Sequence, residues 1–328
     1  MFDEILKLIK EHDSIVIFGH INPDGDCYGA QVGLRELILT LYPTKKVYIT
    51  GTGCPKFFSV LPKMDVVSDE VIKDSLALLV DANDLPRMED SRIFNCKAWA
   101  KIDHHIDTGG FTEGPFVVDV LANSTCDIIA GFVMDYNLKI SKLGANALYL
   151  GILTDSARFQ FVNDYPQTFA RVKFLCEHGA EPTKLSNMMN KTDEQSLIVK
   201  GYIMSHYKKT KAGVIYIVYN KETLHRIGAS ANEVSNLVNL LSNIEGYPIW
   251  CSFAEYDDGK VRCEFRSNGP EVQPVAASIG GGGHAMASGC QLNSLDRKFI
   301  SQIIKKYDKT LIQWRKKEHV GKRTSSRN

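Results

Sequence analysis

The side chains best suited to catalysis or metal binding are histidines and aspartates that each lie beside an apolar segment. The segment FGHINPDGDCYGA, residues 18–30, holds the first group, and LLVDAND, KIDHHID and GILTDSARF hold the later ones. Imidazole nitrogens and carboxylate oxygens together suit divalent metal ions, and four carboxylates in one pocket would repel one another without such a charge. The candidate metal ligands are His20, Asp24, Asp26, Asp81, His104 and Asp155.

Two divalent cations would cancel the formal charge of the four aspartates. A pair of ions about 3.5 to 4 Å apart clamps a phosphate, activates a water molecule and stabilises the charge that develops on the phosphoryl oxygens. Pro23 and Gly25 can shape the tight turn from which Asp24 and Asp26 reach neighbouring ions. The expected reaction is phosphoester hydrolysis. Mixed histidine and carboxylate ligation favours manganese, so we expect two Mn²⁺ ions, with Mg²⁺ or Co²⁺ as possible substitutes.

The elements that must position these residues are short apolar strands. SIVIFG runs into His20, LALLV into Asp81 and AWAKI into Asp103, while the helix-like GANALYLGILTDS carries Asp155 near its end. Continuous apolar strands indicate a parallel sheet covered on both faces, in which ligands bind beyond the carboxyl ends of the strands. Taken alone, NPDGD is more often a loop and DHH more often a polar strand end. Their joint occurrence beside apolar segments favours the metal site.

The second half of the chain starts a new set of elements, and 328 residues are enough for two domains. GVIYIVYN predicts a strand, IWCSFAEYDDGKVRCEFRS a hairpin turning at Asp258 and Gly259, and a final helix begins at about residue 294. The predicted class is α/β, with a parallel-sheet N-terminal domain, a smaller α/β C-terminal substrate-binding domain and a cleft between them. The expected ranges are 1–185 for the catalytic domain, 186–210 for a linker, 211–316 for the C-terminal domain and 317–328 for a basic, frayed tail.

Composition excludes several classes of protein. The net charge of +1 gives no basic track for long nucleic acid, and no apolar run is long enough to span a bilayer. The N-terminus, MFDEILKLIKEHDS, lacks the basic and apolar stretches of a secretory signal. The cysteines form no Cys-x-x-Cys pair, so they are expected to be reduced and mainly buried. We therefore expect a cytoplasmic protein with no membrane partner.

The quoted motifs resemble the four successive motifs of the DHH phosphoesterases, and GGGGHAMASG resembles the glycine-rich motif of the C-terminal domain that accompanies one branch of them. This resemblance implies a two-manganese centre with His20 and Asp24 on one ion, Asp26, His104 and Asp155 on the other, and Asp81 bridging them. It also implies that His105 faces the scissile phosphate, that Asp103 orients the neighbouring ligands and that Arg158 approaches the substrate.

The resemblance extends to nucleotide binding by the second half of the chain. There the family's arginine-serine element and glycine-rich turn match Arg266, Ser267, Gly281, Gly282, Gly283 and His284. These residue types suit phosphate binding, because backbone amides of a glycine run can surround a phosphate and an arginine can contact it through two hydrogen bonds.

Length and motif order are similar to the branch of bacterial nanoRNases and 3′-phosphoadenosine-5′-phosphate (pAp) phosphatases. This similarity implies short RNA oligonucleotides, pApA and pAp as substrates, and a homodimer. The alternatives are a cyclic di-AMP phosphodiesterase, a soluble inorganic pyrophosphatase and a non-catalytic nucleotide sensor. Two departures concern substrate preference: IDTGGFTEG lacks the asparagine expected after the histidines, and Asp127 stands where a glutamate is common.

Overall fold

The chain forms two compact units, residues 1–191 and 192–328. The computed structural model describes residues 2–51, 60–82, 85–106 and 114–325. The segment IDTGGFTEG, on which one expected departure from the family pattern depends, lies mostly outside these residues. Within the described residues, no helix has the length and apolar character needed to cross a bilayer.

The N-terminal unit is built on a five-stranded sheet in the order β2-β1-β3-β4-β5, and every strand pair in it is parallel. The predicted parallel sheet is therefore confirmed. The strands are β1 (Ser14–Phe18), β2 (Lys46–Ile49), β3 (Leu76–Val80), β4 (Ala98–Asp103) and β5 (Phe116–Val118).

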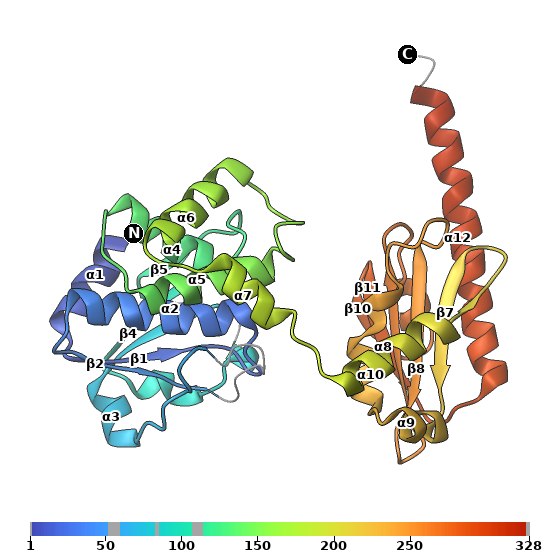
Figure 1. Cartoon of the computed structure of the whole chain (residues 1–328), viewed down its shortest axis with the longest axis horizontal. Helices are drawn as coiled ribbons and strands as arrows, with labels where there is room; N and C mark the ends of the chain where they lie inside the picture. Colours follow the sequence, from blue (N-terminus) through green and yellow to red (C-terminus); the bar gives the residue numbers. More distant parts are fainter. Residues whose placement is uncertain (1, 52–59, 83–84, 107–113, 326–328) are drawn as a thin grey trace. The chain divides into compact units, whose positions relative to one another are not determined.

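Apolar side chains cover both faces of this sheet, which explains why its central strands lack a polar alternation. Ile15 and Ile17 of β1 join the core beneath α1 (Phe2–Glu11), α2 (Gly25–Leu41), α4 (Thr125–Asp135) and α5 (Lys142–Asp155). Val16 and Phe18 join a second cluster beside α3 (Asp69–Asp74) and the 3₁₀ turn η3 (Ser91–Asn95). Figure 1 shows α2 and α5 on one side of the sheet and α3 on the other.

Close packing of α2 against α5 brings two predicted ligands toward each other. A Cβ atom on Gly29 of α2 would lie 2.5 Å from the carbonyl oxygen of Ala147, and one on Gly151 of α5 would lie 3.0 Å from Oδ1 of Asp26. Only glycine allows this approach. It places Asp26, in the first turn of α2, near Asp155, the last residue of α5. The unit ends with α6 (Tyr165–Glu177) and α7 (Pro182–Met189).

The C-terminal unit contains a six-stranded mixed sheet in the order β10-β11-β9-β8-β7-β6. The strands are β6 (Lys208–Lys209), β7 (Val214–Tyr219), β8 (Ile249–Glu255), β9 (Val261–Ser267), β10 (Gly282–His284) and β11 (Ala287–Leu292). The predicted hairpin is present, because β8 and β9 pair antiparallel and Gly259 adopts a φ of 84° in the turn. The expected separate C-terminal sheet domain is therefore confirmed.

Helices cover both faces of the second sheet (Figure 1). One face packs on α12 (Arg297–Ser325), and the other packs on α8 (Glu194–His206), α9 (Lys221–Ile227), α10 (Ala231–Asn236) and the 3₁₀ turn η4 (Val238–Leu241). The short α11 (Gln273–Ala277) precedes the glycine-rich segment.

Two segments, the expected linker and the C-terminal tail, are mainly helical. Between α7 and α8 only residues 190–193 are non-helical, so most of the expected linker is helix. The backbone of α12 continues to Ser325, whereas a frayed tail was expected from residue 317. The tail is rich in lysine and arginine, which have good helix propensity, and it contains no proline to end the helix.

Candidate metal centre and nucleotide-binding hairpin

The predicted metal ligands lie at the carboxyl ends of three parallel strands and at two helix ends. His20, Asp81 and His104 follow β1, β3 and β4 closely, where a parallel sheet places its ligands. Asp26 and Asp155 come from α2 and α5. The structure therefore brings residues from five separate elements into one cluster, which we call the acidic rim.

Asp81 occupies the middle of the acidic rim. Its Oδ2 lies 3.4 Å from Nε2 of His20, and its Oδ1 lies 3.5 Å from Nε2 of His104 and 3.4 Å from Nδ1 of His105. The Asp81 backbone has a φ of 58°, in the left-handed region, which carries a conformational cost for residues other than glycine. The Thr125 hydroxyl donates to Oδ1 over 3.1 Å. Packing and hydrogen bonding thus hold this carboxylate where three imidazoles converge.

Asp26 and Asp155 flank His104 in a second part of the acidic rim. Nε2 of His104 lies 3.9 Å from Oδ2 of Asp26 and 3.6 Å from Oδ2 of Asp155. The Asp26 carboxylate accepts the backbone N–H groups of Thr125 and Cys126, at 2.7 and 2.9 Å, from the N-terminus of α4. The N-terminal end of α4 therefore fixes the orientation of this inward-pointing carboxyl group.

The crowding of these carboxylates has an electrostatic cost. Burial, together with the charges of Asp81 and Asp155, raises the pKa of Asp26 well above its usual range. Burial and the neighbouring carboxylates of Asp81 and Asp24 raise the pKa of Asp155 to about 6, although His104 opposes this shift. A divalent cation among these oxygens would remove the repulsion, so the donor set fits a metal centre.

His20 presents one ring nitrogen for coordination. Its Nδ1 donates to the carbonyl oxygen of Ile21 over 2.8 Å, so in the neutral ring the lone pair lies on Nε2. Nε2 is buried and makes no hydrogen bond among the described residues. Burial would lower the pKa of His20, but the adjacent carboxylates of Asp24 and Asp81 raise it overall. A backbone carbonyl that fixes the tautomer in this way is typical of histidine ligands to metals.

Asp24 is the least enclosed of the predicted ligands. Its side chain is 60% exposed, and Oδ1 lies 3.7 Å from Nε2 of His20. The same carboxylate caps α2 by accepting the backbone N–H groups of Asp26 and Cys27. Asp24 therefore already has a structural role as an N-cap, in addition to the predicted role in metal binding.

His105 and Asp103 form a hydrogen-bonded pair at the end of β4. Nδ1 of His105 donates to Oδ1 of Asp103 over 3.0 Å. Oδ2 of Asp103 lies 3.0 Å from Nζ of Lys101, and both residues are almost fully buried. Burial alone would raise the pKa of Asp103, but the hydrogen bond from His105 and the charge of Lys101 lower it overall. The hydrogen bond to Asp103 raises the pKa of His105.

Three residues near the acidic rim were missed by sequence reasoning as parts of a site. Cys27 has its sulfur within 4.8 Å of ligand atoms of His20 and Asp81. Lys101 interrupts the apolar strand AWAKI, and this interruption was the available signal for its buried ion pair. Thr125 follows Ser124, the N-cap of α4, but no local pattern shows that its N–H reaches a carboxylate 99 positions earlier.

Two other predicted positions have local surroundings that the sequence did not reveal. Arg158 is exposed and belongs to a run of three residues, 157–159, with φ between 47° and 63°. Its predicted approach to the substrate stays a prediction. Asp127 is buried and pairs with Arg171 of α6 over 2.7 Å. Its shorter side chain is therefore used to join α4 to α6.

The predicted nucleotide-binding residues lie on adjacent strands of the C-terminal sheet. Ala287 of β11 is paired with His284 of β10 on one side and with Arg266 of β9 on the other. Cross-strand partners share a face, so His284 and Arg266 lie on the same face with only a methyl side chain between them. Gly283, at φ 123°, approaches β11 so closely that a Cβ would lie 2.6 Å from the Ala287 oxygen.

Arg266 and Ser267 both have partners within the unit. A guanidinium nitrogen of Arg266 lies 3.0 Å from Oε2 of Glu264, and another donates to the carbonyl oxygen of Ser288. The Ser267 hydroxyl accepts the N–H of Gly269 over 2.9 Å. The pair is therefore held in place by its neighbours before any ligand binds. We call residues 281–287 the glycine-rich hairpin.

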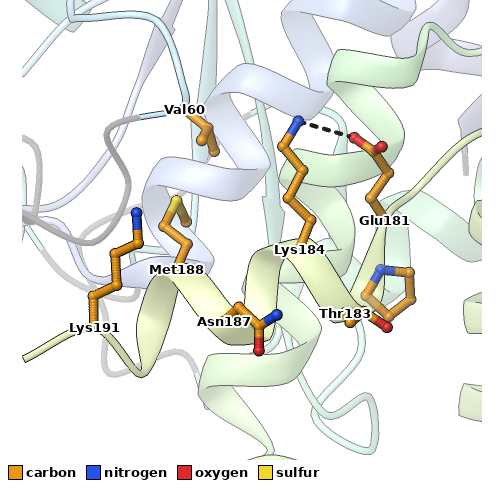
Figure 2. Close-up of a pocket in the computed structure, with 8 residues that line it drawn as sticks. Val60, Glu181, Thr183, Lys184, Asn187, Met188 and Lys191 are labelled. Atoms are coloured by element: carbon orange, nitrogen blue, oxygen red, sulfur yellow. Dashed lines mark hydrogen bonds and ion pairs between the residues drawn. The ribbon is translucent and has the colours of Figure 1, made fainter.

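A pocket of about 660 Å³ lies in another part of the N-terminal unit (Figure 2). It is formed by α7, its flanking residues and Val60, and Lys184 there pairs with Glu181 over 3.2 Å. None of the residues in its described lining is a predicted metal ligand. The volume of a cavity alone therefore does not identify the acidic rim.

Comparisons with known proteins match each half of the chain to a domain of the DHH phosphoesterases. The DHH family N-terminal domain matches residues 14–152, and the DHHA1 domain matches residues 210–313. The probable bifunctional oligoribonuclease and PAP phosphatase NrnA of Streptococcus mutans is 33% identical over 294 residues, which cover 90% of this chain and 94% of the relative. The bifunctional oligoribonuclease and PAP phosphatase NrnA of Mycoplasma pneumoniae is 36% identical over 297 residues, covering 89% and 91%.

A solved structure shares the fold. The crystal structure of an exopolyphosphatase-related protein from Bacteroides fragilis superimposes with a TM-score of 0.81 and 24% identity, over 94% of this chain and 96% of that one. From the two domain matches and the extended similarity to these relatives, the chain belongs to the DHH family of phosphoesterases.

Proposed function

We propose that the protein hydrolyses very short oligoribonucleotides and linear dinucleotides such as pApA to nucleoside 5′-monophosphates, and that it also converts pAp to AMP. The convergence of imidazoles on the buried carboxylate of Asp81 carries this proposal, because it is a donor set suited to phosphoester chemistry. The names of the two relatives, which mention an oligoribonuclease and a PAP phosphatase, supply the substrate class.

The acidic rim would hold two divalent ions, for which we propose manganese first and magnesium or cobalt as substitutes. The proposed ligands are His20, Asp24, Asp26, Asp81, His104 and Asp155, with Asp81 shared between the ions. Bound ions would supply positive charge to the phosphate and lower the pKa of the attacking water.

Residues beside the acidic rim are proposed to bind the substrate and to orient the groups that contact it. His105, held by Asp103 through Nδ1, is cationic more readily than a free histidine and is proposed to donate a hydrogen bond to a phosphoryl oxygen from Nε2. Asp103 keeps the ring in one orientation, and Lys101 keeps Asp103 ionised. Arg158 is proposed to contact the substrate from the turn after Asp155.

The glycine-rich hairpin is proposed to bind the nucleotide part of the substrate. Gly281, Gly282 and Gly283 would offer backbone N–H groups to a phosphate, while His284, Arg266 and Ser267 would add side-chain contacts. Because Arg266 is already held by Glu264 and Ser288, little side-chain freedom is lost on binding. A cytoplasmic location and a homodimer belong to the same proposal.

An anion-exchange time course tests the proposed function. The purified protein with Mn²⁺ is incubated in parallel with pApA, pAp, cyclic di-AMP and pyrophosphate. Rapid conversion of pApA and pAp to AMP is the expected result. Turnover of cyclic di-AMP or pyrophosphate in their place would support a cyclic di-AMP phosphodiesterase or a pyrophosphatase, and binding without turnover would support a nucleotide sensor.

A further inference from the structure

Two cysteines face each other directly across adjacent strands of the C-terminal sheet. Cys263 of β9 is the in-register antiparallel partner of Cys290 of β11. Such partners have Cα atoms about 4.5 to 5.5 Å apart and side chains on one face. A disulfide needs a Cα separation of about 4.4 to 6.8 Å. The backbone therefore already meets this requirement for a bond between the two sulfurs.

The two thiols have different surroundings. Cys263 is 1% exposed and belongs to the core beneath α12, whereas Cys290 is half-buried at the edge of that core. The interaction between the two neighbouring thiols lowers the pKa of Cys290 and, together with burial, raises the pKa of Cys263. Cys290 is therefore the accessible thiol that forms a thiolate first, and Cys263 is the buried partner.

The pair lies directly under the glycine-rich hairpin. A Cβ atom on Gly281 would come within 2.6 Å of the Cys290 Cβ and within 2.2 Å of the Gly289 oxygen. The backbone at Gly281 therefore rests on Cys290, and β11 carries both Cys290 and the strand that pairs with β10. A covalent change at Cys290 would therefore alter the packing of the hairpin.

We propose that Cys263 and Cys290 are an oxidation site, which closes reversibly into a cross-strand disulfide under the glycine-rich hairpin when the protein meets a low-molecular-weight disulfide such as oxidised glutathione. The Cys290 thiolate attacks the glutathione disulfide, forms a mixed disulfide and releases one glutathione thiolate. The Cys263 thiolate then attacks the Cys290 sulfur and releases the second. The two protein thiols lose two electrons and two protons, and the oxidant becomes two thiols.

Closure of this bridge ties β11 to β9 and so restricts the hairpin that β11 forms with β10. Formation of the bond is independent of the proposed function, and only its effect on nucleotide binding rests on that function. We expect backbone amide exchange over residues 281–287 to slow by about tenfold in the oxidised protein.

Peptide mapping of the full chain tests the bridge. The protein is incubated with oxidised glutathione, its free thiols are alkylated, and it is digested with trypsin. The cleavage sites isolate Cys263 in residues 263–266 and Cys290 in residues 267–297, while Cys251 falls in a third peptide. The expected product is a cross-linked pair of the first two peptides, which dithiothreitol separates.

Matched variants complete the design. Cys290→Ser and Cys263→Ser are each expected to abolish the cross-link, whereas Cys176→Ser, at an exposed single thiol, should leave it unchanged. The proposal is overturned if Cys290 carries only glutathione while Cys263 stays alkylated, or if Cys251 is the partner found. An unchanged exchange rate at residues 281–287 in the cross-linked protein would refute the link to the hairpin. Loss of pApA turnover in both redox states would contradict only the proposed function.

Discussion

The two sites predicted from the sequence are built in opposite ways. The acidic rim gathers histidines and aspartates from five elements, of which His20, Asp26 and Asp81 are buried, and one of its hydrogen bonds joins residues 99 positions apart. The glycine-rich hairpin is made of consecutive residues, and its neighbours Arg266 and Ser267 lie on the strand beside it. The difference teaches that the rim depends on the whole N-terminal fold, whereas the hairpin depends on strand register. Substitutions should therefore damage the two sites in different ways.

The largest effect is expected from Asp81→Ala, which removes the carboxylate shared by three imidazoles. Turnover should fall by about a thousandfold or more, and tight Mn²⁺ binding measured by calorimetry should be lost with it. Asp135→Ala, at an exposed carboxylate on α4, serves as the control and should change neither quantity. Near-normal turnover by the Asp81 variant would contradict this view of the acidic rim, because activity would then not require its central carboxylate.

Lys101→Met tests whether the rim depends on charge buried beneath it. The change leaves Asp103 without its cation, so the free energy of unfolding in urea should fall by about 3 to 5 kcal/mol. The matched control is Lys97→Met, which breaks the exposed ion pair with Asp74 and should cost less than about 1 kcal/mol. Equal losses of unfolding free energy in the two variants would show that the buried ion pair contributes no more to stability than the exposed one.

Arg266→Ala should affect the hairpin site without changing the chemical step. We expect KM for pApA to rise by about tenfold to a hundredfold, while kcat and Mn²⁺ binding stay within about twofold of the unmodified protein. Arg262→Ala removes a guanidinium from the same strand and face, where it pairs with the same Glu264, and should leave KM nearly unchanged. A fall in kcat alone would argue against a role in substrate binding.

The smallest expected effect concerns pH and Asp155 in the metal-free protein. Its folded pKa of about 6 lies above its usual value of 3.8, so the folded state binds more protons between these two values. Stability should therefore fall as pH rises from about 4 to about 6, by at most about 2 kcal/mol from this group, because solvent screens an exposed carboxyl group. Urea unfolding of Asp155→Asn should show a flatter pH dependence, and added Mn²⁺ should reverse the loss at neutral pH. Parallel pH curves for both proteins would contradict the shift.

Much of the rim could be predicted because it follows strand ends. The apolar runs before His20 and Asp81 indicated a parallel sheet, and such a sheet gathers the residues at its carboxyl edge. What holds those residues could not be predicted. The amides that fix Asp26 come from a helix far along the chain. The left-handed backbone conformation of Asp81 occurs at a residue other than glycine, so the sequence gives no signal for it.

The hairpin shows the reverse pattern. Its glycines were visible in the sequence, but the pairing of Arg266 with Ala287 depends on strand register, which local composition does not fix. The same limit applies to Cys263 and Cys290. They are separated in the sequence without any motif, and only the register makes them partners. The tail forms more helix than expected. Its lysines and arginines have good helix propensity, but they produce no apolar periodicity from which a helix could be predicted.

The hydrogen bonds that fix Asp26 have a consequence for synthesis of the chain on the ribosome. Asp26 leaves the ribosome early, but its amide partners follow 99 and 100 positions later, and Asp155 follows them. Until then the early carboxylates are separate, hydrated anions with no closed site. The centre is therefore completed only when α4 and α5 have formed, and a nascent chain that stalls before this point has no complete site in which to retain a metal ion.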